Sequence, residues 1–293
     1  MTTATQTTTD VLEVPGAVLT YDVRTNATSD LPALLLIGSP MGAAGFGTLA
    51  GHFPDRTVLT YDPRGSERSR RTGGATTTTP EEHADDLSRL MSALDVGPVD
   101  LFASSGGAVN ALALVARRPD QVRTLVAHEP PLAALLPDRK IALAASRDIH
   151  DTYLRDGMGP AMAKFIAIVS HQGLLPDDYL ERPAPDPAMF GLPTDDDGLR
   201  DDVLVGQNIV SCTHFEPDVE ALRAASTRVV LAAGAESGGE LAHRGAVAVA
   251  ERLGTAPVTF PGGHGGFLGG EYGQMGAPDA FAARLREVLA ARS

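Results

Sequence analysis

The sequence predicts an α/β fold: a mostly parallel sheet covered by helices on both faces, with a helical insertion between two strands. Short apolar runs rich in Val and Leu alternate with longer amphipathic stretches along most of the chain. This alternation is typical of a parallel sheet with right-handed crossovers. It stops over residues 131–216, where helical patterns and a Pro/Asp-rich stretch replace the apolar runs.

The predicted strands are short and mostly apolar. Residues 17–23 (AVLTYDV) alternate apolar and polar side chains, as a strand at the edge of a sheet does. The other runs suit strands that are buried on both faces of a sheet. They span residues 33–38, 56–62, 98–104, 122–128, 227–234 and 256–260. Residues 1–10 are polar and rich in Thr, so we expect them to be disordered.

Four helices are predicted between and after these strands. The first has Pro and acidic residues at its start and an apolar face, and others end at a Pro or a Gly, as helices commonly do. They span residues 80–96, 106–120, 240–254 and 278–292. We therefore expect a core made of residues 11–130 and 217–293, and a helical cap, residues 131–216, over one edge of the sheet.

Composition excludes several classes of function. The 293 residues include 37 acidic and 24 basic side chains, a net charge of −13. This balance argues against nucleic acid or an anionic membrane as a partner, since both require a basic face. Cys212 is the only cysteine, so no intrachain disulfide is possible. No signal peptide or membrane-spanning run is evident, and we expect a cytoplasmic protein. A homodimer is one oligomeric state that the sequence leaves open.

Two adjacent serines stand at the end of the fourth predicted strand. A nucleophile on a strand-to-helix turn needs small residues two positions before and after it, because the strand and helix approach closely there. Centring the turn on Ser105 places Ala103 and Gly107 at these positions, whereas centring it on Ser104 places Phe102 at a crowded one. Ser105 is therefore the predicted nucleophile, and Ser104 is a predicted neighbour at the mouth of the pocket.

Two further stretches fit acyl-transfer chemistry. The N–H of Gly106, at the start of the next helix, can donate to a developing oxyanion. The Gly-rich loop within residues 34–46 can supply a second backbone donor. A serine alone is a poor nucleophile and needs a base. His264, in the GGHGG loop after the last predicted strand, is the candidate.

These stretches together resemble the α/β-hydrolase family. The resemblance covers about residues 11–292 outside the insertion, and rests on ASSGG, IGSPMG, YDPRGSERS and GGHGG. It implies an eight-stranded type of sheet, a Ser–His–acid triad and catalysis without a cofactor. It also implies oxyanion donors from the backbone of Ser39 and Gly106. Family members commonly carry His-Gly before the oxyanion residue, but this chain has Ile37-Gly38, a change that mainly alters how the loop is braced.

The acid is not at the position that the family usually uses. That position lies three residues beyond the Gly that ends the seventh strand, and counting from Gly234 gives Ser237, which cannot serve. Glu236 is one residue short. A second position, used in part of the family, is the end of the sixth strand, where this chain has Glu129. Its distance along the chain from Ser105 resembles that of the haloalkane dehalogenases. Glu129 is our first choice and Glu236 the second.

The expected function is hydrolysis of an ester, lactone or related acyl bond of a small, largely apolar molecule. No metal is expected, since the histidines show no metal-ligand spacing. The candidate pocket residues are Met41 and Ser104 from the core and Met162 and Phe165 from the cap. A dehalogenase or epoxide hydrolase would carry Asp at position 105. Two alternatives stay open: a non-hydrolytic protein on this fold, such as a ligand-binding module, cyclase or transferase, and perhydrolase-like activity on the same triad.

Overall fold

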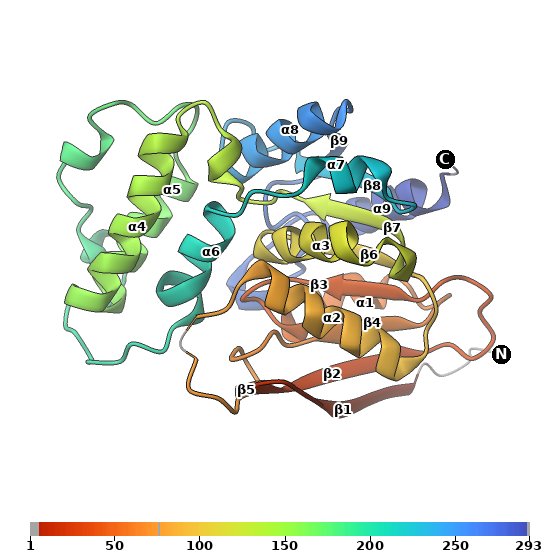
Figure 1. Cartoon of the computed structure of the whole chain (residues 1–293). Coiled ribbons are helices and arrows are strands. Elements are labelled where there is room, and N and C mark those ends of the chain that lie inside the picture. Colours follow the sequence, from red (N-terminus) through yellow and green to blue (C-terminus); the bar gives the residue numbers. More distant parts are fainter. Residues whose placement is uncertain (1–5, 76, 292–293) are drawn as a thin grey trace.

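The computed structural model describes residues 6–75 and 77–291, and its centre is an open nine-stranded sheet (Figure 1). Its main path runs β1-β2-β4-β3-β6-β7-β8-β9, with the short β5 paired to β2. The pairs that involve β2 are antiparallel, and all others are parallel. The strands are β1 Gln6–Val14, β2 Ala17–Thr25, β3 Leu34–Ile37, β4 Val58–Tyr61, β5 Arg70–Arg71, β6 Val99–Ser104, β7 Val122–His128, β8 Arg228–Gly234 and β9 Val258–Phe260.

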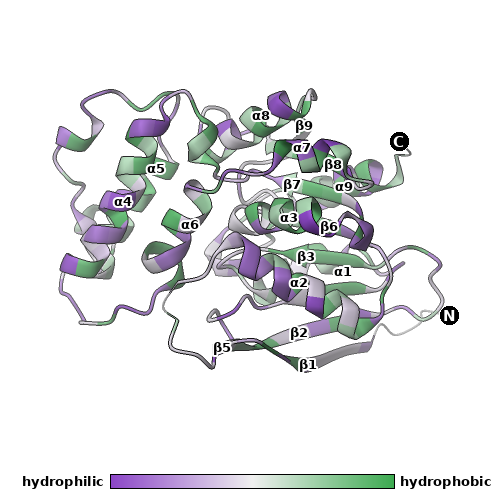
Figure 2. Ribbon diagram, in the orientation of Figure 1, coloured by the Kyte–Doolittle hydropathy of each residue, from purple (hydrophilic) through white to green (hydrophobic). Residues whose placement is uncertain are grey.

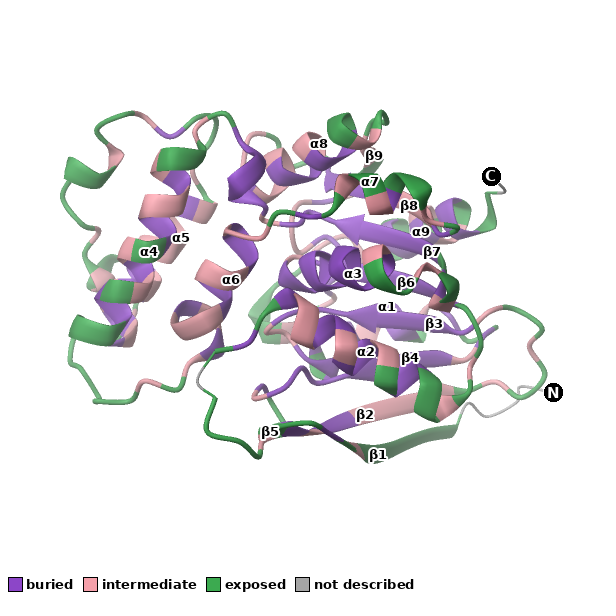
Figure 3. Cartoon of the chain, viewed as in Figure 1, coloured by how far each residue is buried: buried purple, intermediate pink, exposed green. Residues whose placement is uncertain are grey.

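The expectation of a disordered N-terminus is wrong for residues 6–10, and residues 1–5 lie outside the described chain. Residues 6–10 form the first half of β1, which pairs with β2 along its whole length, from Gln6 opposite Thr25 to Val14 opposite Ala17. Most of β1 is exposed (Figure 3), so it lacks the apolar alternation that marks a half-buried strand. Its β-branched threonines favour an extended backbone, and β2 supplies the hydrogen bonds.

Alternate side chains of the strands face two helical layers. In β3, Leu35 and Ile37 pack on one side, while Leu34 and Leu36 pack on the other, as the period of two of a strand requires. One layer is α2 (Pro80–Leu94), α3 (Gly106–Arg117), α7 (Val219–Ala224) and α8 (Leu241–Leu253), and the other is α1 (Gly47–Gly51) and α9 (Pro278–Ala290). The central strands are accordingly apolar along most of their length (Figure 2).

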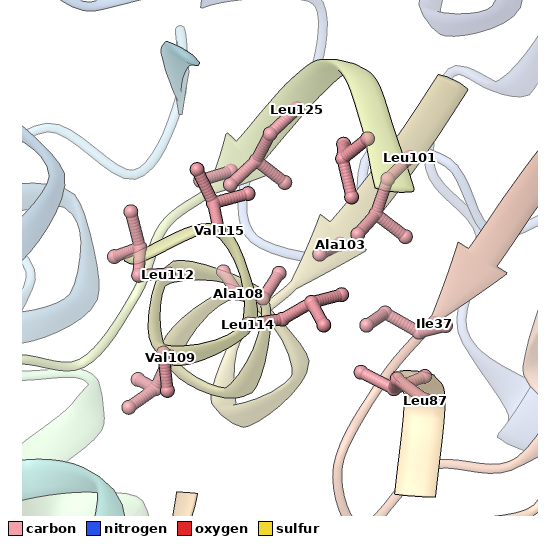
Figure 4. Packing of buried hydrophobic residues seen from close by; sticks show 14 of the residues in the cluster. Ile37, Leu87, Leu101, Ala103, Ala108, Val109, Leu112, Leu114, Val115 and Leu125 are labelled. Atoms are coloured by element: carbon pink, nitrogen blue, oxygen red, sulfur yellow. The ribbon is translucent and has the colours of Figure 1, made fainter. Parts of the chain in front are cut away.

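The helix after the predicted nucleophile packs directly on the sheet. Leu101 and Ala103 of β6 and Leu125 of β7 belong to one buried cluster with Leu112 and Val115 of α3 (Figure 4). The burial of α3 against two neighbouring strands fixes the direction of its N-terminus, at residue 106, relative to the carboxyl ends of those strands.

The segment between β7 and β8, residues 129–227, is fully described and contains helices but no strand. It holds α4 (Arg139–Asp156), α5 (Met158–Val169), a π-helix (Leu204–Asn208) and α6 (Ile209–Thr213), besides α7. The first four pack around an apolar cluster of their own and lie beyond the carboxyl ends of the parallel strands, at the left of Figure 1. Within the described chain, no helix is both long and apolar enough to cross a membrane.

Candidate active site

The backbone at Ser105 is strained. This residue joins β6 to α3 with φ 56° and ψ −127°, a conformation that residues other than Gly rarely adopt. Its N–H donates to the carbonyl of His128 (2.9 Å), and its carbonyl accepts the N–H of Ala108 (2.9 Å). Its hydroxyl makes no capping bond to α3 and lines a cavity at the carboxyl edge of the sheet. The turn thus presents the hydroxyl to that cavity.

The small residues after Ser105 are required by a neighbouring loop. A Cβ at Gly107 would lie 2.8 Å from both the Cα of Gly38 and the carbonyl oxygen of Ile37. A Cβ at Gly106 would lie 2.5 Å from the carbonyl oxygen of Ser39. The sequence predicts that the strand and helix of the turn itself crowd these positions. In the structure, the close contact is with the loop after β3, because β3 lies beside β6 in the sheet.

This contact predicts a large difference between two Gly→Ala variants. Gly107→Ala forces the β3 loop away from α3 and should lower the free energy of unfolding by about 1–3 kcal/mol. Gly51→Ala is the matched control, since a Cβ there meets nothing within 4 Å. It should leave stability unchanged or slightly raised. Urea denaturation of both variants measures the difference, and equal midpoints would contradict the packing argument.

The two predicted oxyanion donors lie against each other. Gly106 is the first residue of α3, where backbone N–H groups have no acceptor within the helix and the helix dipole is positive. Ser39 is packed against Gly106, and both line the same cavity as Ser105. Such an arrangement can stabilise the negative charge on an oxygen that forms beside the Ser105 hydroxyl.

His264 is hydrogen-bonded to the buried carboxylate of Glu129. The distance from its Nδ1 to Oε2 of Glu129 is 2.6 Å. Glu129 immediately follows β7 and is completely buried. Its other oxygen, Oε1, accepts the N–H of Gly234 (2.8 Å) and the hydroxyl of Ser237. His264, in the loop after β9, lines the same cavity as Ser105. With Nδ1 bound to Glu129, Nε2 is left to exchange a proton with a substrate or nucleophile.

The carboxyl group of Glu129 is strongly acidic. Burial by itself raises its pKa, but the hydrogen bonds from His264 and Ser237 outweigh this effect, and the pKa falls to about 2. Glu129 is therefore ionised at neutral pH and can stabilise a protonated imidazole. Glu236, our second choice, is exposed on the loop after β8, where its N–H donates to Gly262. The carboxylate that His264 contacts is that of Glu129.

The contacts of three residues around this pair were not predicted from the sequence. Ser237 stands where the family usually has its acid, and here its hydroxyl donates to Glu129. Nδ1 of His243 lies 3.6 Å from the same carboxylate. His128 is fully buried, 3.2 Å from the Ser104 hydroxyl, and its ring lies 6.1 Å from that of His264. Burial lowers the pKa of His128 to about 4, so this ring is neutral at neutral pH.

A cavity of about 360 Å³ adjoins Ser105 and His264 and is lined mainly by apolar side chains. Most of them come from the helices between β7 and β8, namely Phe165, Ile166, Ile168, Val169, Leu204 and Ile209, and Leu241 is added by the start of α8. A more open cavity of about 790 Å³ meets it at Ser39, Ser105 and His264. Its wall includes the carboxylates of Glu67, Asp201 and Asp202.

Three of the four predicted pocket residues line these cavities. Met41 and Ser104 line the open one, and Phe165 lines both. Met162 lines neither and packs into the apolar cluster of the insertion, because the last turns of α5, from Phe165 onward, are the part that faces the cavity. In the described part of the chain, no group of three or more His, Cys, Asp or Glu side chains could hold a metal ion.

Comparison with known proteins places the chain in a family. A family model for the alpha/beta hydrolase fold matches residues 34–178. The uncharacterized hydrolase YraK of Bacillus subtilis (strain 168) is 31% identical over 262 residues, which cover 87% of this chain and 89% of the relative. The chain belongs to the α/β-hydrolase family. Its predicted fold class is therefore confirmed.

Solved α/β-hydrolases share this architecture at low identity. A thermophilic esterase from Thermogutta terrifontis has a TM-score of 0.65 and 20% identity, with 97% of this chain and 98% of the other covered. The enol-lactonase from Burkholderia xenovorans LB400 has a TM-score of 0.63 and 17% identity, with 96% and 100% covered. At these identities the likeness shows the fold.

Proposed function

We propose that this α/β-hydrolase is a serine esterase that cleaves an ester, lactone or related acyl bond of a small, largely apolar molecule. The observation that carries the proposal is the 2.6 Å contact between His264 and the buried Glu129 at the cavity into which the strained Ser105 turn opens. A base that is held by a carboxylate and shares a cavity with a serine hydroxyl is the arrangement that activates serine as a nucleophile.

In the proposed reaction, Oγ of Ser105 attacks the carbonyl carbon while Nε2 of His264 takes its proton. The ionised Glu129 stabilises the resulting imidazolium through Nδ1. The N–H groups of Ser39 and Gly106 hold the oxyanion. His264 then returns the proton to the departing alkoxide, and an acyl-enzyme remains on Ser105. Water, deprotonated by His264, attacks this ester and releases the acid by the same steps.

The shape and charge of the site support a neutral, partly apolar substrate. The cavity of about 360 Å³ lies in the size range of small-molecule sites, and its apolar walls would bury a hydrocarbon group next to Ser105. The carboxylates of Glu67, Asp201 and Asp202 on the open side disfavour an anionic substrate, since like charges repel. The lactonase and esterase among the structural neighbours agree with an acyl substrate.

A fluorophosphonate probe tests the proposal directly, because it labels an activated serine irrespective of the substrate. We expect the folded protein to be labelled, and to hydrolyse members of a panel of p-nitrophenyl esters of increasing chain length followed by lactones. A folded protein that stays unlabelled and inactive on the whole panel would remove the esterase proposal in favour of a non-hydrolytic protein on this fold.

The apolar cavity predicts a change of chain-length preference in Val169→Phe. Val169 lines the cavity, so the larger side chain should lower kcat/KM for p-nitrophenyl octanoate by about 10-fold or more and leave the acetate within about twofold. Met162→Phe on the same helix is the control, since Met162 packs away from the cavity. Identical chain-length profiles for the two variants would show that this cavity does not hold the acyl group.

A further inference from the structure

The π-helix Leu204–Asn208 connects the helical insertion to the core at two points. The Nδ2 of Asn208 donates to Oγ of Ser39 over 2.9 Å. The neighbouring Gln207 accepts a hydrogen bond from Arg71, on β5, which pairs with β2. Segments of π-helix are rare, and they frequently occur at functional sites. Here the segment places consecutive side chains on two different parts of the core.

The hydrogen bond from Asn208 is shielded from water. The exposed fraction is 3% for Asn208 and 5% for Ser39, and both residues line the cavity that contains Ser105. Loss of either partner would therefore leave the other buried without its hydrogen bond.

Ser39 is held on each side by a different element. Its carbonyl is in close contact with Gly106 of α3, which prevents movement toward the helix. Further along the same loop, the N–H of Ala43 donates to Oδ1 of Asp62 (2.8 Å). The two residues before Ser39 are Ile37 and Gly38, whose side chains can form no hydrogen bond that would hold the loop. The side chain of Asn208 supplies a contact to the oxyanion residue from the insertion.

We propose that Asn208 is a positioning residue for the oxyanion site: by holding Oγ of Ser39, it directs the N–H of Ser39 toward the developing oxyanion. The inference rests on the proposed esterase function. Oxyanion stabilisation depends on donors about 2.7–3.1 Å from the place that the oxyanion occupies, so a small shift of this loop weakens it. The insertion then contributes to the rate of the reaction and not only to substrate selection.

The test is a double-mutant cycle on Asn208 and Ser39. Asn208→Ala and Ser39→Ala each remove the same hydrogen bond and keep the backbone N–H of residue 39. Each should lower kcat for a short p-nitrophenyl ester by about 10- to 100-fold, part of the loss known for removal of a whole oxyanion donor. KM should change less than about twofold. The double variant should be no slower than the slower single variant, because the bond can be lost only once.

A transition-state analogue separates positioning from a general effect on folding. A trifluoromethyl ketone forms a tetrahedral oxyanion on an active serine, so its Ki should rise by the same factor as kcat falls. Gln207→Ala is the matched control: it removes the other contact of the π-helix with the core and should keep kcat near wild type. Thermal unfolding checks that each variant is folded. If Asn208→Ala fails to fold, Ser39→Ala carries the test, since it leaves the insertion intact.

Four results would overturn the inference: wild-type kcat in Ser39→Ala, additive losses in the double variant, an equal loss in Gln207→Ala, or a loss confined to KM. The last of these would assign Asn208 to substrate binding instead. Failure of the esterase proposal is distinguishable from all of these, because the wild-type protein would then resist fluorophosphonate labelling.

Discussion

Ser105→Ala is expected to abolish fluorophosphonate labelling and to lower kcat for ester hydrolysis by about 10³- to 10⁶-fold, as loss of a triad nucleophile does. The variant removes the hydroxyl of the strained residue at the turn, which lines the same cavity as His264. Alanine can adopt the same backbone conformation no more easily than serine, so stability should change little. Residual activity would come from binding and from the oxyanion donors.

Ser104→Ala is the control for this result. The hydroxyl of Ser104 lies 3.2 Å from Nδ1 of the buried His128, and the residue itself is 2% exposed. Labelling should persist in this variant. Loss of labelling in Ser104→Ala together with labelled Ser105→Ala would show that the turn had been centred on the wrong serine.

Glu129→Gln should lower kcat by up to about 10⁴-fold near neutral pH. The carboxylate of Glu129 accepts hydrogen bonds from His264, Gly234 and Ser237, and all three partners act as donors. A glutamine would have to turn an NH₂ group toward one of them. It would also remove the negative charge that stabilises the imidazolium, and the amide oxygen or nitrogen could hold His264 in the unproductive tautomer.

Glu236→Gln is the matched comparison, since it makes the same change on the exposed loop after β8. A surface substitution away from the site usually has a small effect, so kcat should stay near wild type. The reverse pattern would move the acid to this loop. Near-neutral results in both variants would require another carboxylate, such as Glu240, which lines the same cavity. Steady-state kinetics on one ester decide among these outcomes.

Local patterns predicted most of the architecture. Each buried strand and each of the four long helices of the core lies within two or three residues of its predicted range, because apolar periodicity reports directly on burial. β1 is the exception, because no strand is predicted over Gln6–Val14. Most of its side chains face solvent, so they show no apolar periodicity. Its extended backbone depends on pairing with β2, which the residues of the strand itself do not predict.

Part of the candidate site could likewise be predicted from the sequence, and part could not. The strand-to-helix turn at Ser105 and the Gly-rich loop around His264 each consist of consecutive residues. The sequence alone therefore indicates the chemistry of each. The competition between Glu129 and Glu236 could not be resolved in that way, since both follow strands that end at the same edge of the sheet. Which of the two carboxylates reaches His264 depends on the direction in which each side chain points. At Glu129 the backbone has a φ of 49°, which no sequence pattern predicts.

The sequence by itself therefore determined the family and the order of strands and helices. It also determined which serine lies at the centre of the turn and which histidine lies in the last loop. Each of these features is encoded by residues that are close together in the sequence. Only the tertiary structure decided which carboxylate meets His264, that Ser237 donates to that carboxylate, and that Asn208 holds Ser39 from 169 positions away. Each of these contacts joins residues from different elements, and their geometry follows from the pairing of β7 with β8 and from the packing of the insertion on the sheet.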